Sequence, residues 1–298
     1  MADRGPTTAE ATVWRVDATA CVVAPDVVAV ESPLELRVEG RPVAVAMRTP
    51  GHDDELAVGF LVSESVVRRR TDLFEITTCP SQADGGRVVD VLLARPEEVD
   101  FQSLTRHVFS ASSCGICGKA AAEAIFHHFP PLPAVSEAWV DPGVVFVLPE
   151  RLRQAQAAFA RTGGLHASAL FSAGGDLRLL REDVGRHNAL DKVLGASVLA
   201  DNWPLDHSIL VLSGRVSFEL MQKSLAARIP VVVAISAPSS LAVEFAQASG
   251  QTLCGFVRDG RMNVYSHPER LRLPVARVDE APDRPDPSGG TTAPAGGR

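Results

Sequence analysis

The chain lacks the features that would place it in a membrane or direct it to secretion. Nowhere do its 298 residues contain an apolar run of about 18 residues, the length that a membrane-spanning helix needs. The first twenty residues, MADRGPTTAEATVWRVDATA, have no uninterrupted apolar core of the kind found in signal peptides. We therefore expect a cytoplasmic protein that has no membrane partner.

Cysteine is also sparse. The chain has five, and an odd, small number over this length does not resemble the disulfide framework of a secreted protein. Two of them, Cys114 and Cys117, form a C-x-x-C pair. In a reducing compartment such a pair is more often catalytic or metal-binding than a structural disulfide.

Basic residues are fewer than acidic ones. The chain has 29 Lys and Arg against 36 Asp and Glu, a formal net charge of -7. This balance argues against a broad electrostatic surface for nucleic acid, so no nucleic-acid partner is expected. It does not exclude a local basic pocket for a small anion. The hydrophobic content of 46% is that of a globular protein and excludes wholesale disorder.

Composition divides the first half of the chain into three parts. Residues 1–10 are expected to be a flexible N-terminus. The Val-rich segments and turn signals of residues 11–110 predict a β-rich N-terminal domain with one helix over residues 53–67. Residues 111–133 hold the C-x-x-C loop, a predicted helix (CGKAAAEAIFHHF) and a proline cluster that we interpret as a domain boundary.

Residues 134–275 alternate between predicted helices and short apolar strands. A helix is expected to start at Pro149, because proline suits the first helical position. HASALFS and LRLLRED flank AGGD as a hairpin, and SILVLSG, PVVVAIS and TLCGFVRDG indicate buried strands separated by helices. This alternation predicts an α/β layered domain with parallel strands in a chain that is α/β (α+β overall). The Pro- and Gly-rich residues 276–298 are expected to be a disordered tail.

The C-x-x-C pair has the setting of a reactive thiol. Cys114 and Cys117 immediately precede a predicted helix, and Lys119 follows two residues later. A helix N-terminus and a nearby cation both favour the thiolate, which is the nucleophilic form. Gly115 and Gly118 leave the backbone free to turn and keep both sulfur atoms accessible.

Other interpretations of the pair stay open. A structural zinc site needs four ligands, and the chain has no second C-x-x-C. His127 and His128 are adjacent, so on a helix they would point about 100° apart and would not converge on one ion. A thioredoxin-like exchanger would place the motif after the first strand of a βαβ unit, which is not its position here. Two inert, buried cysteines are the least specific interpretation.

Several long blocks resemble the formate dehydrogenase accessory protein family, FdhD. They are SSCGICGK, TGGLHASALF, EDVGRHNALDKVLG, LSGRVSFELMQKSLAARIPVVVAISAPSSLAVEFA, GFVRDGRMNVYSHPERL and the earlier RTPGHDDELAVGFLVSESVV. The resemblance covers roughly residues 20–275. Because the blocks are long and occur in order, they are far more specific than the C-x-x-C pair alone.

The resemblance implies a cytoplasmic sulfur carrier. Such proteins receive sulfur from a cysteine desulfurase as a cysteine persulfide and pass it to the bis-guanine-dinucleotide molybdenum cofactor before that cofactor enters formate dehydrogenase. On the matching motif, Cys114 would carry the persulfide and Cys117 would be its partner or relay. The cofactor is cargo, and no permanently bound metal is implied. Members are dimers, and their C-terminal domain is similar to the cytidine deaminase fold.

The family's cofactor-binding segment maps onto one short stretch of this chain, made up of Phe256, Val257, Arg258, Asp259, Gly260 and Arg261. Guanidinium forks match phosphate geometry, and glycine allows close backbone approach. Taken alone, the RDGR sequence is a weak signal that favours a β-turn with two solvated arginines, and the family resemblance reverses that preference.

Other polar positions are weaker candidates for the pocket. EDVGRHNALDK places Arg186, His187, Asn188 and Lys192 near a predicted helix start, where anions are favoured; the alternative is helix capping and a solvated face. Ser213, Gly214 and Arg215 close a strand and open a helix, the usual ligand-facing edge of an α/β sheet.

His166 tests the likeness to deaminases. Zinc deaminases pair H-x-E with a later P-C-x-x-C, whereas Ser168 stands here in the position of the glutamate. Deaminase chemistry should therefore be absent, and His166 is either a core histidine or part of the cofactor pocket. Cys21, Cys79 and Cys254 are expected to be small buried residues. The alternative functions are a zinc-binding deaminase-like hydrolase and a chaperone that holds the cofactor without sulfur transfer.

Overall fold

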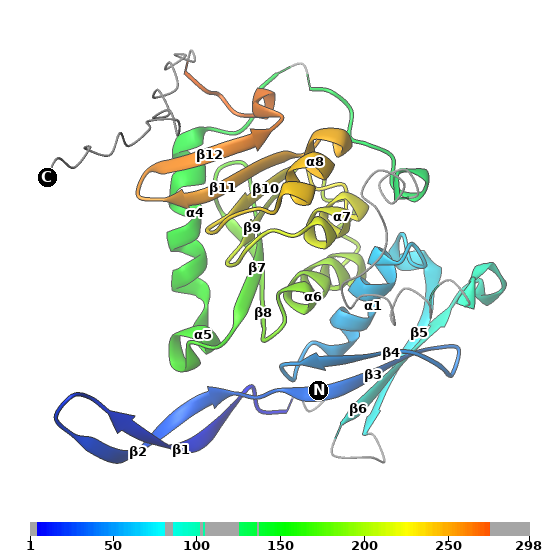
Figure 1. The fold of residues 1–298 in the computed structure, drawn as a ribbon. Helices are drawn as coiled ribbons and strands as arrows, with labels where there is room; N and C mark the ends of the chain where they lie inside the picture. The colour runs from blue at the N-terminus through cyan, green and yellow to red at the C-terminus, as the bar shows by residue number, and fades with distance from the viewer. Residues whose placement is uncertain (1–4, 81–85, 102–103, 105–124, 136, 275–298) are drawn as a thin grey trace, which may run out of the picture.

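The computed structural model describes residues 5–80, 86–101, 104, 125–135 and 137–274. These residues form a six-stranded sheet, a four-stranded sheet and a separate two-stranded hairpin (Figure 1). The mixed α/β class expected from the sequence is confirmed. In the described part of the chain, no helix is long and apolar enough to cross a membrane.

The six-stranded sheet has the strand order β12-β11-β10-β9-β7-β8. Strands β9, β10 and β11 run parallel, whereas β7 and β12 are antiparallel to the strands that they flank. The predicted hairpin of β7 and β8 is confirmed, and the parallel arrangement holds for the three strands whose connections contain helices. The strands are His166–Phe171 (β7), Leu177–Asp183 (β8), Ile209–Leu212 (β9), Val231–Ala234 (β10), Thr252–Arg258 (β11) and Arg261–Ser266 (β12).

Helices cover both faces of this sheet, so every residue of β9 and β10 is buried. One face packs against α6 (Arg186–Leu199), α7 (Phe218–Ala226) and α8 (Ser240–Ser249). The other face packs against α4 (Pro142–Ala155), the long green helix in Figure 1. The short helix α5 (Ala157–Thr162) follows α4 and leads into β7.

The predicted start of a helix at Pro149 is wrong. Helix α4 begins about two turns earlier, because Asp141 caps it by accepting a hydrogen bond from the Gly143 amide at 2.7 Å and Pro142 takes the first helical position. Pro149 lies inside the helix.

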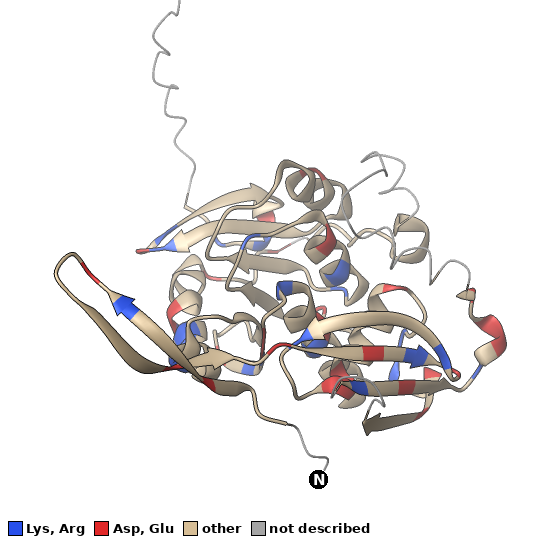
Figure 2. Ribbon diagram, turned by 60° about the horizontal axis from the view of Figure 1, so that its bottom comes forward, with Lys and Arg blue, Asp and Glu red and all other residues tan. Residues whose placement is uncertain are grey.

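The N-terminal part builds the four-stranded sheet in the order β4-β3-β6-β5. Helix α1 (Asp53–Ser63) packs between this sheet and α6, and one hydrophobic core runs from the sheet through α1 to α7. Figure 2 shows acidic and basic residues interspersed on this sheet. Its strands are Ser32–Val38 (β3), Arg41–Arg48 (β4), Leu73–Pro80 (β5) and Arg87–Leu93 (β6).

The hairpin of β1 (Thr8–Val16) and β2 (Cys21–Ala29) projects from the body as an arm (Figure 1). Because β1 begins at Thr8, the last residues of the segment expected to be flexible belong to a strand. The register pairs Trp14 with Val23 and Val16 with Cys21, so these four side chains share one face of the arm. Trp14 and Val16 are 71% and 70% exposed.

Two glycines allow α1 and α6 to cross at close range. A Cβ at Gly59 would lie 1.8 Å from the Asp191 carbonyl oxygen, and one at Gly195 would lie 1.8 Å from the Glu55 carbonyl oxygen. Next to this crossing, Asp191 accepts hydrogen bonds from Ser63 Oγ at 3.0 Å and from Lys223 Nζ at 2.9 Å. The N-terminal and C-terminal parts are therefore joined by direct backbone packing and by the buried hydrogen bond from Ser63 to Asp191.

We expect Gly195→Ala to destabilise the fold by about 3 kcal/mol, because the added methyl would force two packed backbones apart. Urea unfolding measures the change. Gly164→Ala is the matched control, since its Cβ would meet nothing closer than 3.8 Å. A free energy of unfolding that is the same for both variants would contradict this account of the helix crossing.

Candidate functional site

The carboxyl ends of the parallel strands bring the sequence candidates to one edge of the six-stranded sheet. Strands β9, β10 and β11 end on this edge, and the antiparallel β7 begins there. Ser213–Arg215 follow β9 directly, His166 opens β7, and Arg186 opens α6 after β8. Ligands of α/β proteins bind outside the carboxyl ends of such strands, so this edge is the candidate site.

His166 lies among charged groups on this edge. It pairs with Asp183 across the β7–β8 ladder, and a Cβ at Gly214 would lie 3.2 Å from His166 Nδ1. Burial lowers the pKa of His166, and the nearby cations Arg186 and Arg215 lower it further, against the opposing effect of Asp183. The imidazole is therefore biased toward its neutral form.

His187, at the first turn of α6, contacts two groups that belong to α7 and its cap. Its Nε2 lies 3.3 Å from Ser217 Oγ and 3.3 Å from Glu219 Oε2. Because both contacts involve the same ring nitrogen, this is not a Ser-His-acid relay, which uses both nitrogens. Burial lowers the pKa of His187; Glu219 opposes this, and Lys223, Arg186 and His166 add to it.

Asn188 and Lys192, expected as pocket candidates, instead hold the N-terminal segment in place. Lys192 is 1% exposed, pairs with Asp183 at 2.6 Å and donates to the Thr49 carbonyl at 2.8 Å. Asn188 Nδ2 donates to the Met47 carbonyl at 2.8 Å and to Asp183 Oδ1 at 3.0 Å. Neither the pocket nor the alternative of helix capping and a solvated face describes these two residues, because Lys192 is buried and both side chains bind the N-terminal segment. Only the arginine and histidine of the motif remain near the ligand edge.

The predicted cofactor segment forms the end of β11 and its turn into β12. Phe256, Asp259 and Gly260 have positive φ angles of 54°, 52° and 68°. The side chain of Val257 is fully buried in the core, so only its backbone is available to a ligand. Arg261 and Asp259 form a salt bridge at 3.7 Å with side chains 76% and 72% exposed. The turn expected for RDGR is thus present, and it presents Arg258 and Arg261 to solvent.

Cys114 and Cys117 lie outside the described residues. The expectation that the other three cysteines are buried holds only for Cys254, whose thiol pKa burial raises to about 12. Cys21 and Cys79 are exposed, because they occupy positions on the projecting arm and near the end of the edge strand β5.

Within the described residues, no group of three or more His, Cys, Asp or Glu side chains could hold a metal ion. The His127 and His128 rings lie 5.4 Å apart at 77° to each other, in an edge-to-face contact. Ser168, in the position of the deaminase glutamate, is 1% exposed, and its Oγ has no hydrogen-bond partner in this part of the chain.

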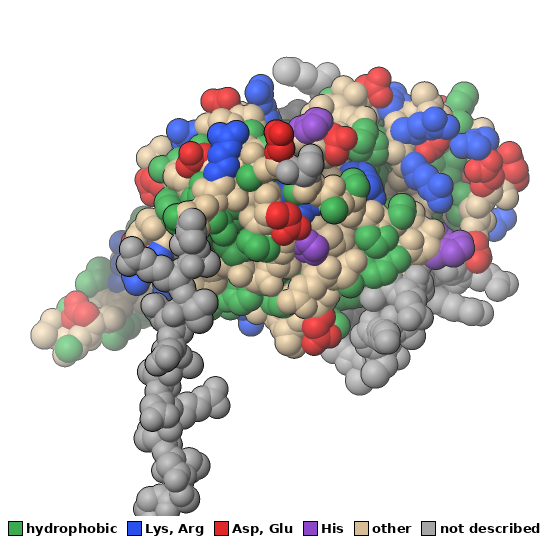
Figure 3. All heavy atoms as spheres, turned by 90° about the horizontal axis from the view of Figure 1, so that it is seen from above, with side chains coloured by type: hydrophobic (Ala, Val, Ile, Leu, Met, Phe, Trp, Pro, Cys, Tyr) green, Lys and Arg blue, Asp and Glu red, His purple; other side chains and the backbone are tan. Residues whose placement is uncertain are grey.

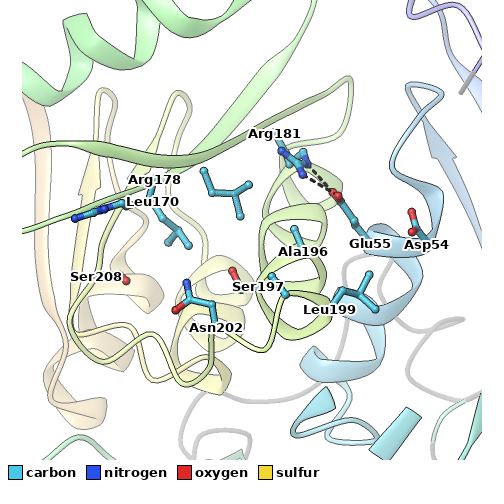
Figure 4. A pocket seen from close by; sticks show the side chains of 12 residues that line it. Asp54, Glu55, Leu170, Arg178, Arg181, Ala196, Ser197, Leu199, Asn202 and Ser208 are labelled. Carbon is cyan, nitrogen blue, oxygen red and sulfur yellow. Dashed lines mark hydrogen bonds and ion pairs between the residues drawn. The ribbon is translucent and has the colours of Figure 1, made fainter. Parts of the chain in front are cut away.

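A separate pocket of about 500 Å³ lies between α1, α6 and β8 (Figure 4). It is lined by the C-terminal half of α6, away from Arg186, and is bordered by Arg181, which donates to Glu55 at 2.7 Å. Although burial opposes the shift, the hydrogen bonds from Arg181 and His52 lower the pKa of Glu55 to about 2. No sequence motif pointed to this pocket, because its residues come from segments that are distant in the chain.

The fold and this edge define a mixed α/β protein with basic groups gathered where a sheet of this kind binds its ligand. The chain belongs to the FdhD/NarQ family, which it matches over residues 29–272.

The chain is similar to proteins named "Sulfur carrier protein FdhD" from several bacteria. It is 47% identical over 277 residues to that of Mycobacterium tuberculosis, covering 90% of this chain and 99% of that protein. It is 46% identical over 277 residues to that of Streptomyces coelicolor, covering 91% and 98%. A solved structure described as a formate dehydrogenase accessory protein from Desulfotalea psychrophila has the same fold, with a TM-score of 0.70 and 24% identity, over 89% of this chain and 100% of that one.

We expect Asp183→Asn to destabilise the protein by about 3–5 kcal/mol, because it leaves the buried Lys192 ammonium without a charged partner. Asp206→Asn, at a position that is 57% exposed, is the control and should have almost no effect. Replacing the pair together, as Asp183→Asn with Lys192→Met, should recover part of the loss in urea unfolding. An Asp183→Asn variant as stable as the control would contradict the structural role of this carboxylate.

Proposed function

We propose that this protein is a cytoplasmic sulfur carrier for formate dehydrogenase. It accepts sulfur from a cysteine desulfurase as a persulfide on Cys114 and transfers it to the bis-guanine-dinucleotide molybdenum cofactor before the enzyme receives that cofactor. The observation that carries the proposal is the similarity, over almost the whole chain, to proteins named as sulfur carriers. The reaction class is that of a sulfurtransferase.

The first step is a thiol exchange. The Cys114 thiolate attacks the outer sulfur of the donor's persulfide; the S–S bond of the donor breaks, and the donor cysteine leaves as a thiolate. Cys114 then carries the sulfur as a persulfide, with no net oxidation. The rate depends on the thiolate fraction and on access. The helix predicted after the pair and Lys119 would both favour the thiolate. Cys117 either resolves the persulfide or holds the sulfur in turn.

Binding of the cofactor requires hydrogen-bond donors for its phosphate groups. Arg258 and Arg261 project from the β11–β12 turn, and Arg186 and Arg215 lie near the ends of neighbouring elements of the same sheet edge. None of Arg186, Arg215 and Arg258 has a salt-bridge partner among the described residues. Free guanidinium groups at the ligand edge of the sheet support binding of a cofactor that carries several phosphates.

Charge elsewhere supports a small-molecule cargo over a nucleic-acid partner. The face seen from above in Figure 3 mixes basic, acidic and hydrophobic side chains. A nucleic-acid interface needs a continuous basic surface.

Incubation of the protein with a cysteine desulfurase and cysteine should add one sulfur atom, reversibly by reductant, in intact mass spectrometry. The adduct should be absent in Cys114→Ala, because this thiol is the attacking group, and present in the matched variants Cys21→Ala and Cys79→Ala. An adduct of equal yield in Cys114→Ala would contradict the assignment.

The alternative functions predict other results. A chaperone that only holds the cofactor would activate formate dehydrogenase in cells with Cys114→Ala but fail with Arg258→Ala or Arg261→Ala. A zinc-binding hydrolase would purify with stoichiometric zinc that is lost when Cys114 and Cys117 are both replaced.

We propose a homodimer in which the arm of each copy contacts the other. The face that carries Trp14, Val16 and Val23 is apolar and exposed. A two-stranded hairpin is marginally stable by itself in water, so a partner that covers this face would stabilise it. The free edge of β1 contains no proline, whereas β2 contains Pro25, so β1 is the edge better suited to pairing.

Trp14→Glu should convert the dimer into a monomer, because a charge would be buried in the contact. Light scattering after size-exclusion chromatography measures the mass. Phe74→Glu is the matched control, since Phe74 is 73% exposed on β5, away from the arm, and this variant should remain a dimer. A wild-type monomer, or a dimer that persists in Trp14→Glu, would contradict the role of the arm.

A further inference from the structure

Four side chains form a basic corner at the candidate site, made up of His166, Arg186, His187 and Arg215. They interact electrostatically: both arginines act on His166, and Arg186 and His166 act on His187. The Nε atom of Arg186 is buried and has no hydrogen-bond partner in the described part of the chain. Arg215 is exposed and makes no ion pair there. The corner therefore contains cations that the described protein does not neutralise.

Two acidic side chains face the histidines of this corner. One is saturated by hydrogen bonds from other groups, and the other contacts His187. Asp183 faces His166 from β8, but its carboxylate accepts hydrogen bonds from Lys192, Gly185, Asn188 and the Thr49 amide. Glu219 on α7 contacts His187 Nε2 at 3.3 Å and is 47% exposed. Lys223, also on α7, faces His187 and pairs with Asp191.

The Gly214 backbone packs closely against the Nδ1 side of the His166 ring. A Cβ at position 214 would lie only 3.2 Å from that atom. On the same face of β7, two residues further along, Ser168 Oγ is buried without a partner in this part of the chain. The ring is thus held against the Gly214 backbone, on the same strand face as a buried hydroxyl that lacks a partner in the described residues.

We propose that His166 and His187 are binding residues for the polyphosphate of a guanosine nucleotide, and that they take up protons when the polyphosphate binds between Arg186 and Arg215. The identity of the nucleotide rests on the proposed function; the assignment of these residues does not follow from it. A neutral imidazole offers one N–H donor, whereas an imidazolium offers two, both in charge-assisted hydrogen bonds.

The direction of the proton transfer follows from the charges. In the free protein, burial lowers the pKa of both histidines; Arg186 adds to this effect at both, and Arg215 adds to it at His166, so the neutral form of each imidazole is favoured. A bound polyphosphate reverses the local potential and raises both pKa values. The affinity of the protein for the ligand must then increase as the pH falls from the histidine pKa of the complex toward that of the free protein. The increase is up to about tenfold per pH unit for each linked proton. Above the pKa of the complex, the two histidines no longer affect the pH dependence of binding.

Isothermal titration calorimetry with guanosine 5′-diphosphate and the full chain tests the proposal. Titrations near neutral pH in buffers of different ionisation enthalpy give the number of protons taken up per ligand bound. The terminal phosphate of the ligand also titrates, with a pKa of about 6, so the titrations are made at pH 7.5, where the free ligand is almost fully ionised and has few protons to release on binding. Differences between the wild type and the variants therefore report on the protein.

The wild type should take up between about one and two protons, the most that two linked imidazoles can contribute. His166→Gln and His187→Gln should each reduce the uptake and weaken binding several-fold, and the double variant should lose the uptake. His207→Gln, at a position that is 94% exposed, is the matched control and should behave as the wild type. Arg186→Gln should weaken binding and still take up protons.

The outcomes separate this inference from the proposed function. Binding without proton uptake by the wild type overturns the inference and leaves nucleotide binding in place; this measurement needs no variant and so does not depend on how the variants fold. Uptake retained in the double variant overturns the assignment to these two residues. No binding at all overturns both the inference and the cofactor half of the proposed function, whereas the sulfur adduct on Cys114 is measured independently.

Discussion

The buried carboxylate of Asp183 determines how the rest of the site is arranged. It is fully buried and accepts hydrogen bonds from the backbone of Thr49, from the backbone of Gly185 and from the side chains of Asn188 and Lys192. One group thereby fixes the end of β8, the start of α6 and the segment that joins the four-stranded sheet to α1. A buried ion is tolerated only when such donors surround it, so this arrangement is specific as well as costly to disturb.

The two halves of the chain consequently form one structure. The hydrophobic core extends across both halves, and α1 crosses α6 at Gly59 and Gly195, where no side chain separates the two backbones. The candidate site lies on the C-terminal sheet close to this junction. The proposed function requires the protein to meet a donor, a cofactor and a client enzyme in turn. A sheet edge whose arginines have no ion-pair partner among the described residues suits the middle step, because it can hold a phosphate ligand without rearrangement.

The strands and helices of the second half could be predicted well from the sequence, because the strands are short apolar runs that alternate with helix-forming segments and are bounded by turn residues. The start of α4 was missed, since the pattern contains two prolines that each suit a first helical position and only the Asp141 cap distinguishes them. The motif EDVGRHNALDK could be recognised as polar from the sequence. Which of its residues bind the N-terminal segment and which face the ligand edge depends on contacts with Met47 and Thr49, more than 130 residues away. The exposure of Cys21 likewise depends on an arm that leaves the body, which local patterns do not encode.

Burial keeps the thiol of Cys254 unreactive. It lies in the middle of the central sheet, and its pKa of about 12 leaves almost no thiolate at neutral pH. A carrier of reactive sulfur can therefore keep a cysteine in its core without diverting any cargo to it. Burial also makes this residue a probe of local unfolding. Alkylating reagents can modify the thiol only in molecules whose central strands have separated, so the labelling rate of Cys254 reports how often the sheet opens.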